Sequence, residues 1–382
     1  MSRRLSRRDF LGSSALLGAG ALVGPRFPQL SRGQASRSKL PQMPWPRTLR
    51  ERVAQLFVIS FVGPTLSYDT LALLDRHAFG GVILYANNCV NASQVHTLLN
   101  DLQTVARYPM LVSMDQEGGK VVRLRKGVPT FPAEAAYGKI ASAQKVLQDA
   151  AATAQALRPL GLSMNLAPVV DVLSNPKSPI GKRSYGSNPQ LVAKLSVAAI
   201  QGYQQHGLAA TAKHFLGLGH TSIDAHTALP TVRLTLQQFE NVDLIPFRAA
   251  IAAGVSTIMV THVALPGIDP VFRPASLSPV IINGVIRNRL GFKGVIMTDS
   301  LMMGALPKGQ EPEAAVRAFQ AGADVLLMAA NGAVNPAVID EAVERVTWLV
   351  YSGQASESRL NASVARIMAL KQRYPAINAI NG

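Results

Sequence analysis

The chain has 382 residues, which excludes a mini-protein held together by cross-links and allows one large domain or two to three ordinary ones. Apolar residues make up 48% and charged residues 16%, a balance that excludes intrinsic disorder. The single cysteine, Cys89, excludes an intramolecular disulfide, and we expect it to be a buried or idle thiol. A net charge of +16 suits a nucleic-acid binder or a protein that works near an anionic surface.

The first 35 residues are expected to be a cleavable export signal. Four arginines precede an apolar run over residues 11–23, which is shorter than the roughly 20 residues needed to cross a bilayer. The run SRRDFL over 6–11 resembles the twin-arginine signal, which exports folded proteins across bacterial inner membranes. We therefore expect a periplasmic or extracellular protein, membrane-anchored if the signal is retained, with the twin-arginine translocase as a transient partner. The signal contributes +5, so the mature chain carries +11.

Eight short apolar runs follow, alternating with amphipathic stretches as in parallel βα units. They are apolar throughout, which is typical of strands covered on both faces. The predicted strands are 56–60, 81–85, 109–115, 163–168, 209–214, 257–261, 294–299 and 323–328. The predicted helices include 141–157, 189–206, 236–253 and 312–321 between the strands, and 335–351 and 360–374 at the end of the domain.

Eight such units predict an α/β protein, a (β/α)8 TIM-type barrel rather than an open doubly wound sheet. We expect a linker over 36–48, a single catalytic domain over 49–375 and a tail over 376–382. In this fold the carboxyl ends of the strands form the active-site face. Polar residues gather where the third to seventh strands end, including Asp115, Glu117, Asn165, Asp171, Lys213, His214, His262 and Asp299.

Six segments in order carry a family resemblance. Three are long: MDQEGGKVVRLRKG over 114–127, AKHFLGLGHTSIDAHTALP over 212–230 and RNRLGFKGVIMTDSLMMGAL over 287–306. Between them stand NLAPVVDV from 165, GKRSYGSNP from 181 and IMVTHVALPGID from 258. From about 49 to 371 the chain resembles glycoside hydrolase family 3, in particular its single-domain β-N-acetylglucosaminidases. This resemblance implies a retaining, exo-acting enzyme without metal or cofactor, which removes terminal N-acetylglucosamine from peptidoglycan fragments or chitin oligosaccharides.

Retaining hydrolysis usually needs a nucleophile and an acid/base group about 5 Å apart. Asp299 ends the seventh predicted strand, and the resemblance implies that it is the nucleophile; an Asp that caps the following helix is the alternative. The resemblance to single-domain relatives assigns the acid/base to His226 and its orientation to Asp224. Histidine titrates near neutrality, and a carboxylate on one ring nitrogen fixes the tautomer. Loop residues or weak metal ligands are the alternatives for this pair.

The resemblance also implies a set of sugar-binding side chains. Cationic donors and an acceptor carboxylate suit a polyol, because each hydroxyl both donates and accepts hydrogen bonds. Ion pairing around the rim is the alternative for Arg123 and Asp171 and the preferred interpretation of Lys182, while Glu117 competes as a second carboxylate. The residues expected to bind substrate are Asp115, Arg123, Arg183, Lys213 and His214.

The chain departs from the family at a few positions. The usual central motif K-H-F-P-G-H-G has Leu216 in place of Pro and Leu218 in place of His, and His220 appears two residues later. Ser300 follows Asp299, where many relatives have a second Asp. A lost polar contact in the central loop would alter affinity or loop position.

The sequence is also compatible with other functions. A β-N-acetylglucosaminide phosphorylase fits because a neutral His repels incoming phosphate less than a carboxylate does, and β-glucosidase or β-xylosidase specificity is also open. A non-catalytic periplasmic sugar-binding or cell-wall-anchoring protein is the non-enzyme alternative. Nucleic-acid binding is disfavoured, because no basic run with interleaved aromatics occurs after the leader. The mature charge favours contact with anionic cell-wall polymers, and a monomer is expected.

Overall fold

A computed structural model describes residues 43–376. The expected export signal lies outside the described residues, as do most of the expected linker and all of the expected tail except its first residue.

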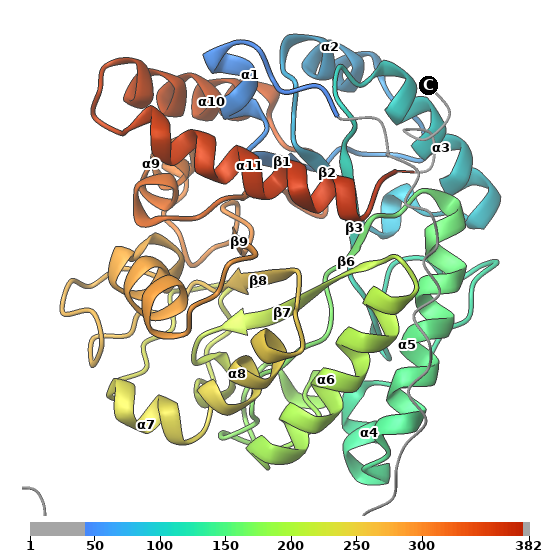
Figure 1. Cartoon of the computed structure of the whole chain (residues 1–382), viewed down its shortest axis with the longest axis vertical. Helices are drawn as coiled ribbons and strands as arrows, with labels where there is room; N and C mark the ends of the chain where they lie inside the picture. Colours follow the sequence, from blue (N-terminus) through green and yellow to red (C-terminus); the bar gives the residue numbers. More distant parts are fainter. Residues whose placement is uncertain (1–42, 377–382) are drawn as a thin grey trace, which may run out of the picture. The chain divides into compact units, whose positions relative to one another are not determined.

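Eight parallel strands form one sheet in the order β10-β1-β2-β3-β6-β7-β8-β9 (Figure 1). A parallel bridge between Met297 and Val325 links β9 to the residue before β10, so the sheet nearly closes on itself. All eight predicted strands and the barrel are therefore confirmed. Their bounds are β1 (Phe57–Ile59), β2 (Gly81–Leu84), β3 (Leu111–Met114), β6 (Met164–Asn165), β7 (Ala209–Phe215), β8 (Thr257–Val260), β9 (Val295–Thr298) and β10 (Leu326–Met328).

Helices surround the barrel, and they include the predicted ones except that over 236–253. The α-helices are α1 (Leu49–Ala54), α2 (Tyr68–Arg76), α3 (Ala92–Val105), α4 (Glu134–Ile140), α5 (Ala143–Leu157), α6 (Pro189–Gln205), α7 (Leu236–Asn241), α8 (Leu244–Ala252), α9 (Glu311–Ala321), α10 (Pro336–Tyr351) and α11 (Glu357–Arg373). Short 3₁₀ segments are η1 (Ala86–Asn88), η2 (Arg158–Leu160), η3 (Gly181–Arg183), η4 (Leu218–His220) and η5 (Ala275–Leu277), and η6 (Val280–Arg289) is π-helical.

The single helix predicted over 236–253 is wrong, because two helices occupy this stretch. A capping box between Thr235 and Gln238 starts α7. The backbone of Val242 then leaves the helical region, with φ −130° and ψ −75°, so α8 begins anew after Asp243. The hairpin of β4 (Gln116–Gly118) and β5 (Val121–Val122) was not predicted either, because its strands are too short to show a period of two.

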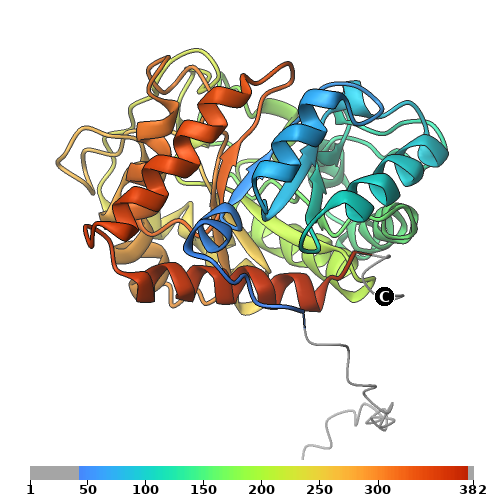
Figure 2. The same ribbon diagram turned by 90° about the horizontal axis from the view of Figure 1, so that it is seen from above.

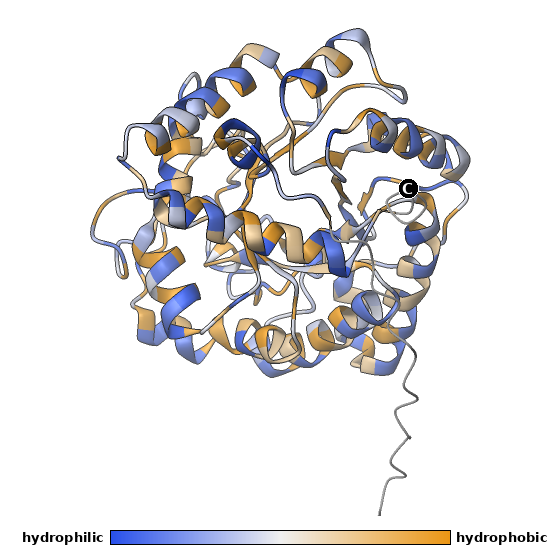
Figure 3. Cartoon of the chain, turned by 45° about the horizontal axis from the view of Figure 1, so that its top comes forward, coloured by the Kyte–Doolittle hydropathy of each residue, from blue (hydrophilic) through white to orange (hydrophobic). Residues whose placement is uncertain are grey.

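The core lies in the barrel and between the barrel and the helices. Every residue of β1, β2, β3, β7, β8, β9 and β10 is buried, which explains why these strands are mostly apolar; Lys213 and His214 on β7 are the ionisable exceptions. The surrounding helices carry hydrophobic and hydrophilic residues in alternating stripes (Figure 3), as expected of elements with one face on the core.

The two ends of the barrel differ. Helix α11 runs beneath one end (Figure 2), where Arg359 donates to the carbonyl of Ala323 and Ser256 donates to the hydroxyl of Tyr374. Ala323 and Ser256 precede β10 and β8, so α11 covers the amino ends of the strands. The polar residues that follow the strands lie at the other end. Within residues 43–376, no helix combines the length and apolar character needed to cross a bilayer.

Candidate active site

One cavity of about 440 Å³ lies at the carboxyl ends of the strands. Seven of the eight predicted site residues line it, although they come from six separate segments of the chain. Asp224 is not among the lining residues but contacts one of them, His226. The predicted site residues that line the cavity are Asp115, Arg123, Arg183, Lys213, His214, His226 and Asp299.

Asp299 directly follows β9, and its backbone N–H donates to the carbonyl of Val260 on the neighbouring strand at 2.8 Å. Its carboxylate accepts one hydrogen bond, from the backbone N–H of Ser300 at 2.8 Å, and forms no ion pair within residues 43–376. The alternative role as a helix cap does not occur, since α9 starts at Glu311 with Gln310 as its N-cap. Asp299 is therefore a rigidly placed carboxylate that is open to the cavity.

His262 holds the turn that follows Asp299. Its Nε2 donates to the carbonyl of Ser300 at 2.8 Å, and its Nδ1 accepts from the hydroxyl of Ser276 at 2.6 Å. Burial lowers the pKa of His262, so the ring is neutral and can serve both bonds at once. The hydroxyl of Ser300, in the place of the family's second Asp, donates to the carbonyl of Ala329. The sequence showed His262 only as a polar residue at a strand end.

The other carboxylates of the cavity are bound by cations. Lys213, in the middle of the site on β7, donates to Asp115 at 2.7 Å and to Glu117 at 2.6 Å. Arg183, on η3, grips Glu117 with two hydrogen bonds of 2.7 and 2.8 Å, and Arg123 donates to Asp115 at 2.8 Å. Three cations and two carboxylates thus form one connected network with donors and acceptors facing the cavity.

This network sets the protonation of its members. Burial raises the pKa of Asp115, but Lys213 and Arg123 outweigh it and hold that pKa well below its usual range. Burial also raises the pKa of Glu117, yet Lys213 and Arg183 outweigh burial and lower this pKa to about 2. Burial lowers the pKa of Lys213, and the two carboxylates more than reverse this. Both carboxylates are therefore charged at neutral pH and have no proton to donate.

Glu117 consequently serves as the anion that fixes two cations rather than as a competing catalytic carboxylate. The alternative of ion pairing holds for Arg123, which pairs with Asp115. Asp171 is buried, and its Oδ2 lies 2.8 Å from Nδ1 of His214. Ion pairing, the preferred interpretation of Lys182, is wrong for that residue, which makes no ion pair in the part of the chain that the structure describes.

Asp224 and His226 form a pair on the loop between η4 and α7. Oδ1 of Asp224 lies 2.7 Å from Nδ1 of the ring and accepts from the backbone N–H of His226 at 2.9 Å. Burial raises the pKa of Asp224, and these bonds together outweigh it and lower the pKa overall. The side chains are 48% and 69% exposed. Nε2 of His226 has no hydrogen-bond partner among the described residues, so it is free to meet a ligand in the cavity.

Backbone hydrogen bonds tie this loop to the segment after Asp299. The N–H of Gly304 donates to the carbonyl of His226 at 3.2 Å, and the N–H of Ala305 donates to the carbonyl of Ala225 at 3.0 Å. The two predicted catalytic groups are therefore connected through a few residues of main chain.

The departures from the family motif are accommodated by packing. Leu216 is fully buried and Leu218 is 6% exposed, so both add to the core. His220 does not line the cavity; its Nε2 lies 2.8 Å from Asp243, and its ring meets Phe239 edge-on. Apolar contacts and the hydrogen bond between His220 and Asp243 thus support this loop in place of the missing Pro and His.

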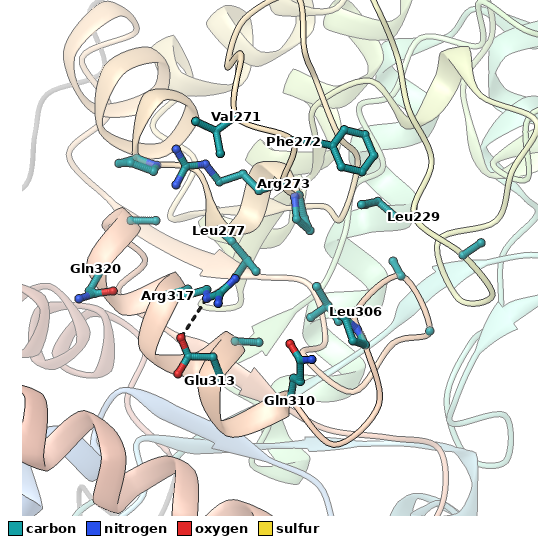
Figure 4. A pocket seen from close by; sticks show the side chains of 18 of the residues that line it. Leu229, Val271, Phe272, Arg273, Leu277, Leu306, Gln310, Glu313, Arg317 and Gln320 are labelled. Atoms are coloured by element: carbon teal, nitrogen blue, oxygen red, sulfur yellow. Dashed lines mark hydrogen bonds and ion pairs between the residues drawn. The ribbon is translucent and has the colours of Figure 1, made fainter.

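A larger cavity of about 890 Å³ adjoins the loop that carries Asp224 and His226 (Figure 4). Gly304 lines both cavities, while His226 lines one and Thr227 the other, so the tethered loop is the wall between them. Apolar side chains dominate this second space, and an ion pair between Arg317 and Glu313 lies on one side. Its apolar lining includes Leu229, Val271, Phe272, Leu277 and Leu306.

Two further side chains of the catalytic cavity were missed by sequence reasoning. Tyr85 follows β2, and the guanidinium of Arg123 lies 5.5 Å from its ring centroid. Asn331 follows β10. No charged side chain marks the ends of these two strands in the sequence, although the carboxyl end of every barrel strand faces the active site.

Cys89 is half-buried and does not line the catalytic cavity, and burial raises its pKa to about 12, so the thiol is protonated and unreactive as expected. Among the described residues, no group of three His, Cys, Asp or Glu side chains is arranged to hold a metal ion.

Comparison with known proteins agrees with this geometry. Residues 48–370 match the model of the glycosyl hydrolase family 3 N-terminal domain. The chain is 32% identical to Beta-hexosaminidase A of Pseudoalteromonas piscicida over 82% of its own length and 57% of that protein. It is also 32% identical to Beta-hexosaminidase of Methylobacillus flagellatus, over 76% of this chain and 84% of that one.

A solved structure of a family 3 β-N-acetylglucosaminidase from Paenibacillus sp. str. FPU-7 superposes with a TM-score of 0.83 at 40% identity. The match covers 88% of this chain and 64% of the Paenibacillus chain, so that relative, like the Pseudoalteromonas one, is considerably longer. The eight-stranded barrel, the cavity at its carboxyl end and the match over 48–370 together place this chain in glycosyl hydrolase family 3.

Proposed function

We propose that this protein is a retaining exo-β-N-acetylglucosaminidase that removes terminal β-linked N-acetylglucosamine from peptidoglycan fragments or chitin oligosaccharides. One observation carries the proposal: Asp299 has an unpaired carboxylate in a cavity where cations neutralise Asp115 and Glu117. An unpaired carboxylate on a rigid strand end is available to attack an anomeric carbon.

In the first step, an oxygen of Asp299 forms a bond to the anomeric carbon while the bond to the leaving oxygen breaks. Protonated His226 gives its Nε2 proton to that oxygen, so the rest of the substrate leaves as an alcohol. Asp224 accepts from Nδ1–H, which keeps the other ring nitrogen directed at the substrate.

In the second step, neutral His226 takes a proton from water, and the water oxygen attacks the anomeric carbon. The bond to Asp299 breaks, and its carboxylate is restored. Two inversions at one carbon return the sugar with its original β configuration.

The cavity supports recognition of a single terminal sugar. Its volume of about 440 Å³ lies near the lower end of the range for small-molecule sites, roughly 300–1,000 Å³. Asp115 is an acceptor and Lys213 and Arg183 are donors that face the space, which suits the hydroxyl groups of a pyranose.

The second cavity supports binding of the leaving group. A proton donor must lie beside the leaving oxygen, so the remainder of the substrate departs past His226 and Thr227, toward this space. Phe272→Ala should raise KM for an oligomeric substrate several-fold without changing KM for an aryl N-acetylglucosaminide, whose leaving group is a single ring. Trp348→Ala, which removes an exposed aromatic side chain from α10, is the matched control and should leave both values unchanged.

The central experiment assays the purified mature protein on a panel of aryl glycosides, with and without inorganic phosphate. We expect release of N-acetylglucosamine from the N-acetylglucosaminide and much slower reaction with the glucoside and xyloside. Asp299→Asn should lower kcat by at least about 1,000-fold, since it removes the nucleophile. Full activity in that variant would overturn the assignment.

The assay with inorganic phosphate tests the phosphorylase alternative. A histidine acid/base that has given up its proton repels an incoming phosphate less than a carboxylate would. Formation of sugar 1-phosphate would identify phosphorolysis, whereas free N-acetylglucosamine at every phosphate concentration supports hydrolysis. Binding of N-acetylglucosamine without turnover from acidic to neutral pH would identify a sugar-binding protein instead.

We also infer export by the twin-arginine route, on the basis of the arginine pair and the short apolar run in the first 35 residues. Replacing Arg7 and Arg8 together by Lys should keep the enzyme in the cytoplasmic fraction. Unchanged recovery from the periplasm or medium would contradict this inference.

A further inference from the structure

A third cavity, of about 320 Å³, lies at the end of the barrel opposite the catalytic site. Helix α11 forms one wall, η6 forms another, and the residues that precede β9 and follow α9 complete it. None of its lining residues lines the catalytic cavity. The catalytic mechanism gives this space no role.

The lining of this cavity is exceptional in charge. Four of its residues are cationic and none is acidic. Three amides add further hydrogen-bond donors. The cations are Arg287, Lys293, Arg359 and Arg366, and the amides are Asn283, Asn288 and Gln320.

A single carboxylate beneath the cavity partly balances these cations. Asp324 is fully buried and accepts from Arg287, from Arg366 at 3.0 Å and from Ser363 at 2.6 Å. It also accepts from the backbone N–H of Ile296 at 2.9 Å, so its oxygens are fully engaged. One negative charge against four positive charges leaves an excess of three.

Arg359 and Lys293 carry two of these three charges, and the third lies on the pair of arginines that share Asp324. Arg359 stacks over the ring of Phe319 at 4.0 Å and donates to Ser363 and to a backbone carbonyl, but it forms no ion pair with any described carboxylate. Burial, together with repulsion from Arg366 and Arg287, lowers the pKa of Arg359 to about 10 despite the attraction of Asp324. Lys293 is exposed and has no hydrogen-bond or ion-pair partner within residues 43–376.

We propose that this cavity binds a phosphate group. The guanidinium and ammonium groups of the lining suit an anion of this kind, because charge-assisted hydrogen bonds from Arg and Lys recognise phosphate oxygens. A bound phosphate would also offset the like-charge crowding around Arg359, which Asp324 offsets only in part. The group comes either from free phosphate or from the phosphodiester backbone of an anionic polymer, and both present non-bridging phosphoryl oxygens that accept hydrogen bonds.

The proposal predicts one saturable site for inorganic phosphate, measured by calorimetry at constant ionic strength with chloride as the background anion. Lys293→Gln and Arg366→Gln should each weaken binding about tenfold, the effect of losing one charge-assisted hydrogen bond. Lys293→Gln removes an exposed, unpaired side chain, so it leaves folding intact even if Arg366→Gln, which takes a partner from Asp324, does not. Arg345→Gln makes the same charge change on α10, away from the cavity, and should not weaken binding.

A second arm replaces phosphate by a poly(glycerol phosphate) chain and so separates the two sources. Binding of inorganic phosphate alone identifies a small-ion site, and binding of the polymer alone identifies a polymer-docking site; either result supports the proposal if Lys293→Gln weakens it. Equal binding by wild type and Lys293→Gln overturns the proposal, as does no binding of either ligand. Loss of phosphate binding in Arg123→Gln, which removes a cation of the catalytic cavity, with retention in Lys293→Gln would place the ion in the catalytic cavity and would also overturn the proposal.

Discussion

At the scale of single residues, the catalytic cavity sorts its carboxylates by what they touch. Asp115 and Glu117 lie against cations, Asp171 lies against His214, Asp224 lies against His226, and Asp299 touches only a backbone N–H. These contacts assign different tasks to chemically identical groups, because a carboxylate that is held by a cation is a poor nucleophile and a poor proton donor.

The acid/base pair gives the first prediction. Asp224→Asn should lower kcat about 100- to 10,000-fold on N-acetylglucosamine oligomers, since the ring of His226 loses the carboxylate that accepts from Nδ1–H. The loss should be much smaller for a dinitrophenyl N-acetylglucosaminide, whose leaving group needs no proton. Steady-state kinetics on both substrates checks this, and an equal loss on the two would indicate a structural role for Asp224.

The ion network gives the second prediction, which concerns stability. The pKa values of Asp115 and Glu117 are lower in the folded protein than the unfolded values of about 4, so their contribution is present above about pH 5 and is lost as the pH falls toward 2. Lys213→Met leaves both carboxylates without their shared cation and should cost about 3–5 kcal/mol at pH 7. The deficit should shrink as both carboxylates become protonated.

Urea unfolding at pH 7 and pH 3.5 measures this difference. Lys177→Met, at an exposed lysine without an ion pair among the described residues, is the matched control and should change stability little at either pH. A deficit in Lys213→Met that does not depend on pH would mean that packing, and not charge, explains it.

At the scale of elements, short irregular segments position the chemistry. The strands carry Lys213 and His214, and they place Asp115 and Asp299 at their ends, while Arg183 lies on η3 and His226 on a loop. The loop has no regular structure of its own near His226, so its position depends on the main-chain bonds to Gly304 and Ala305 and on the tight packing of η4.

Gly219 in η4 gives the third prediction. A Cβ at this position would lie 2.0 Å from the carbonyl oxygen of Val172, which is backbone and has little freedom to move. Gly219→Ala should therefore displace the loop, cost about 1–3 kcal/mol and lower kcat/KM through Asp224 and His226. Gly284→Ala, where an added Cβ meets nothing within 4 Å, should keep wild-type activity. Thermal unfolding and kinetics on both variants check this, and wild-type kcat/KM in Gly219→Ala would contradict it.

At the scale of the whole molecule, the two ends of the barrel serve different purposes. The carboxyl end carries the catalytic cavity, and the amino end is closed by α11. Lys371 on α11 is 2% exposed and donates to Oε1 of Gln55 at 2.6 Å, without a carboxylate partner among the described residues. Burial lowers its pKa to about 7.

Lys371 gives the fourth prediction. The unfolded pKa of lysine is about 10.4, so between pH 7 and about 10 the unfolded chain binds a proton that the folded protein lacks, and stability should rise with pH. Lys371→Met removes this dependence, so its stability relative to wild type should improve by up to about 4 kcal/mol as the pH is lowered from 10 to 6. Chemical denaturation across this range measures it.

Lys194→Met, at an exposed lysine of α6, controls for the loss of one positive charge and should keep the pH dependence of the wild type. A Lys371→Met variant with the same pH dependence as wild type would show that Lys371 is protonated in the folded protein at neutral pH.

The barrel could be predicted from the sequence because burial on both faces keeps each strand mostly apolar, and eight such runs with intervening helices leave few alternatives. The site could be predicted in outline for the same reason, since parallel strands bring Asp115, Lys213 and Asp299 to one end of the barrel. The break between α7 and α8 could not, because it depends on the backbone of Val242 and not on hydrophobic periodicity.

The sequence by itself determined the fold class, the face that carries the chemistry and the residue types present there. Only the tertiary structure decided which carboxylate lies against which cation, because those pairs join residues far apart in the chain, such as Glu117 with Arg183 and Asp115 with Lys213. It also decided that the basic excess gathers partly around one cavity beneath the barrel. Hydrophobic patterning is local and can be read along the chain, whereas ion pairs and cavities depend on distances between segments that folding alone brings together.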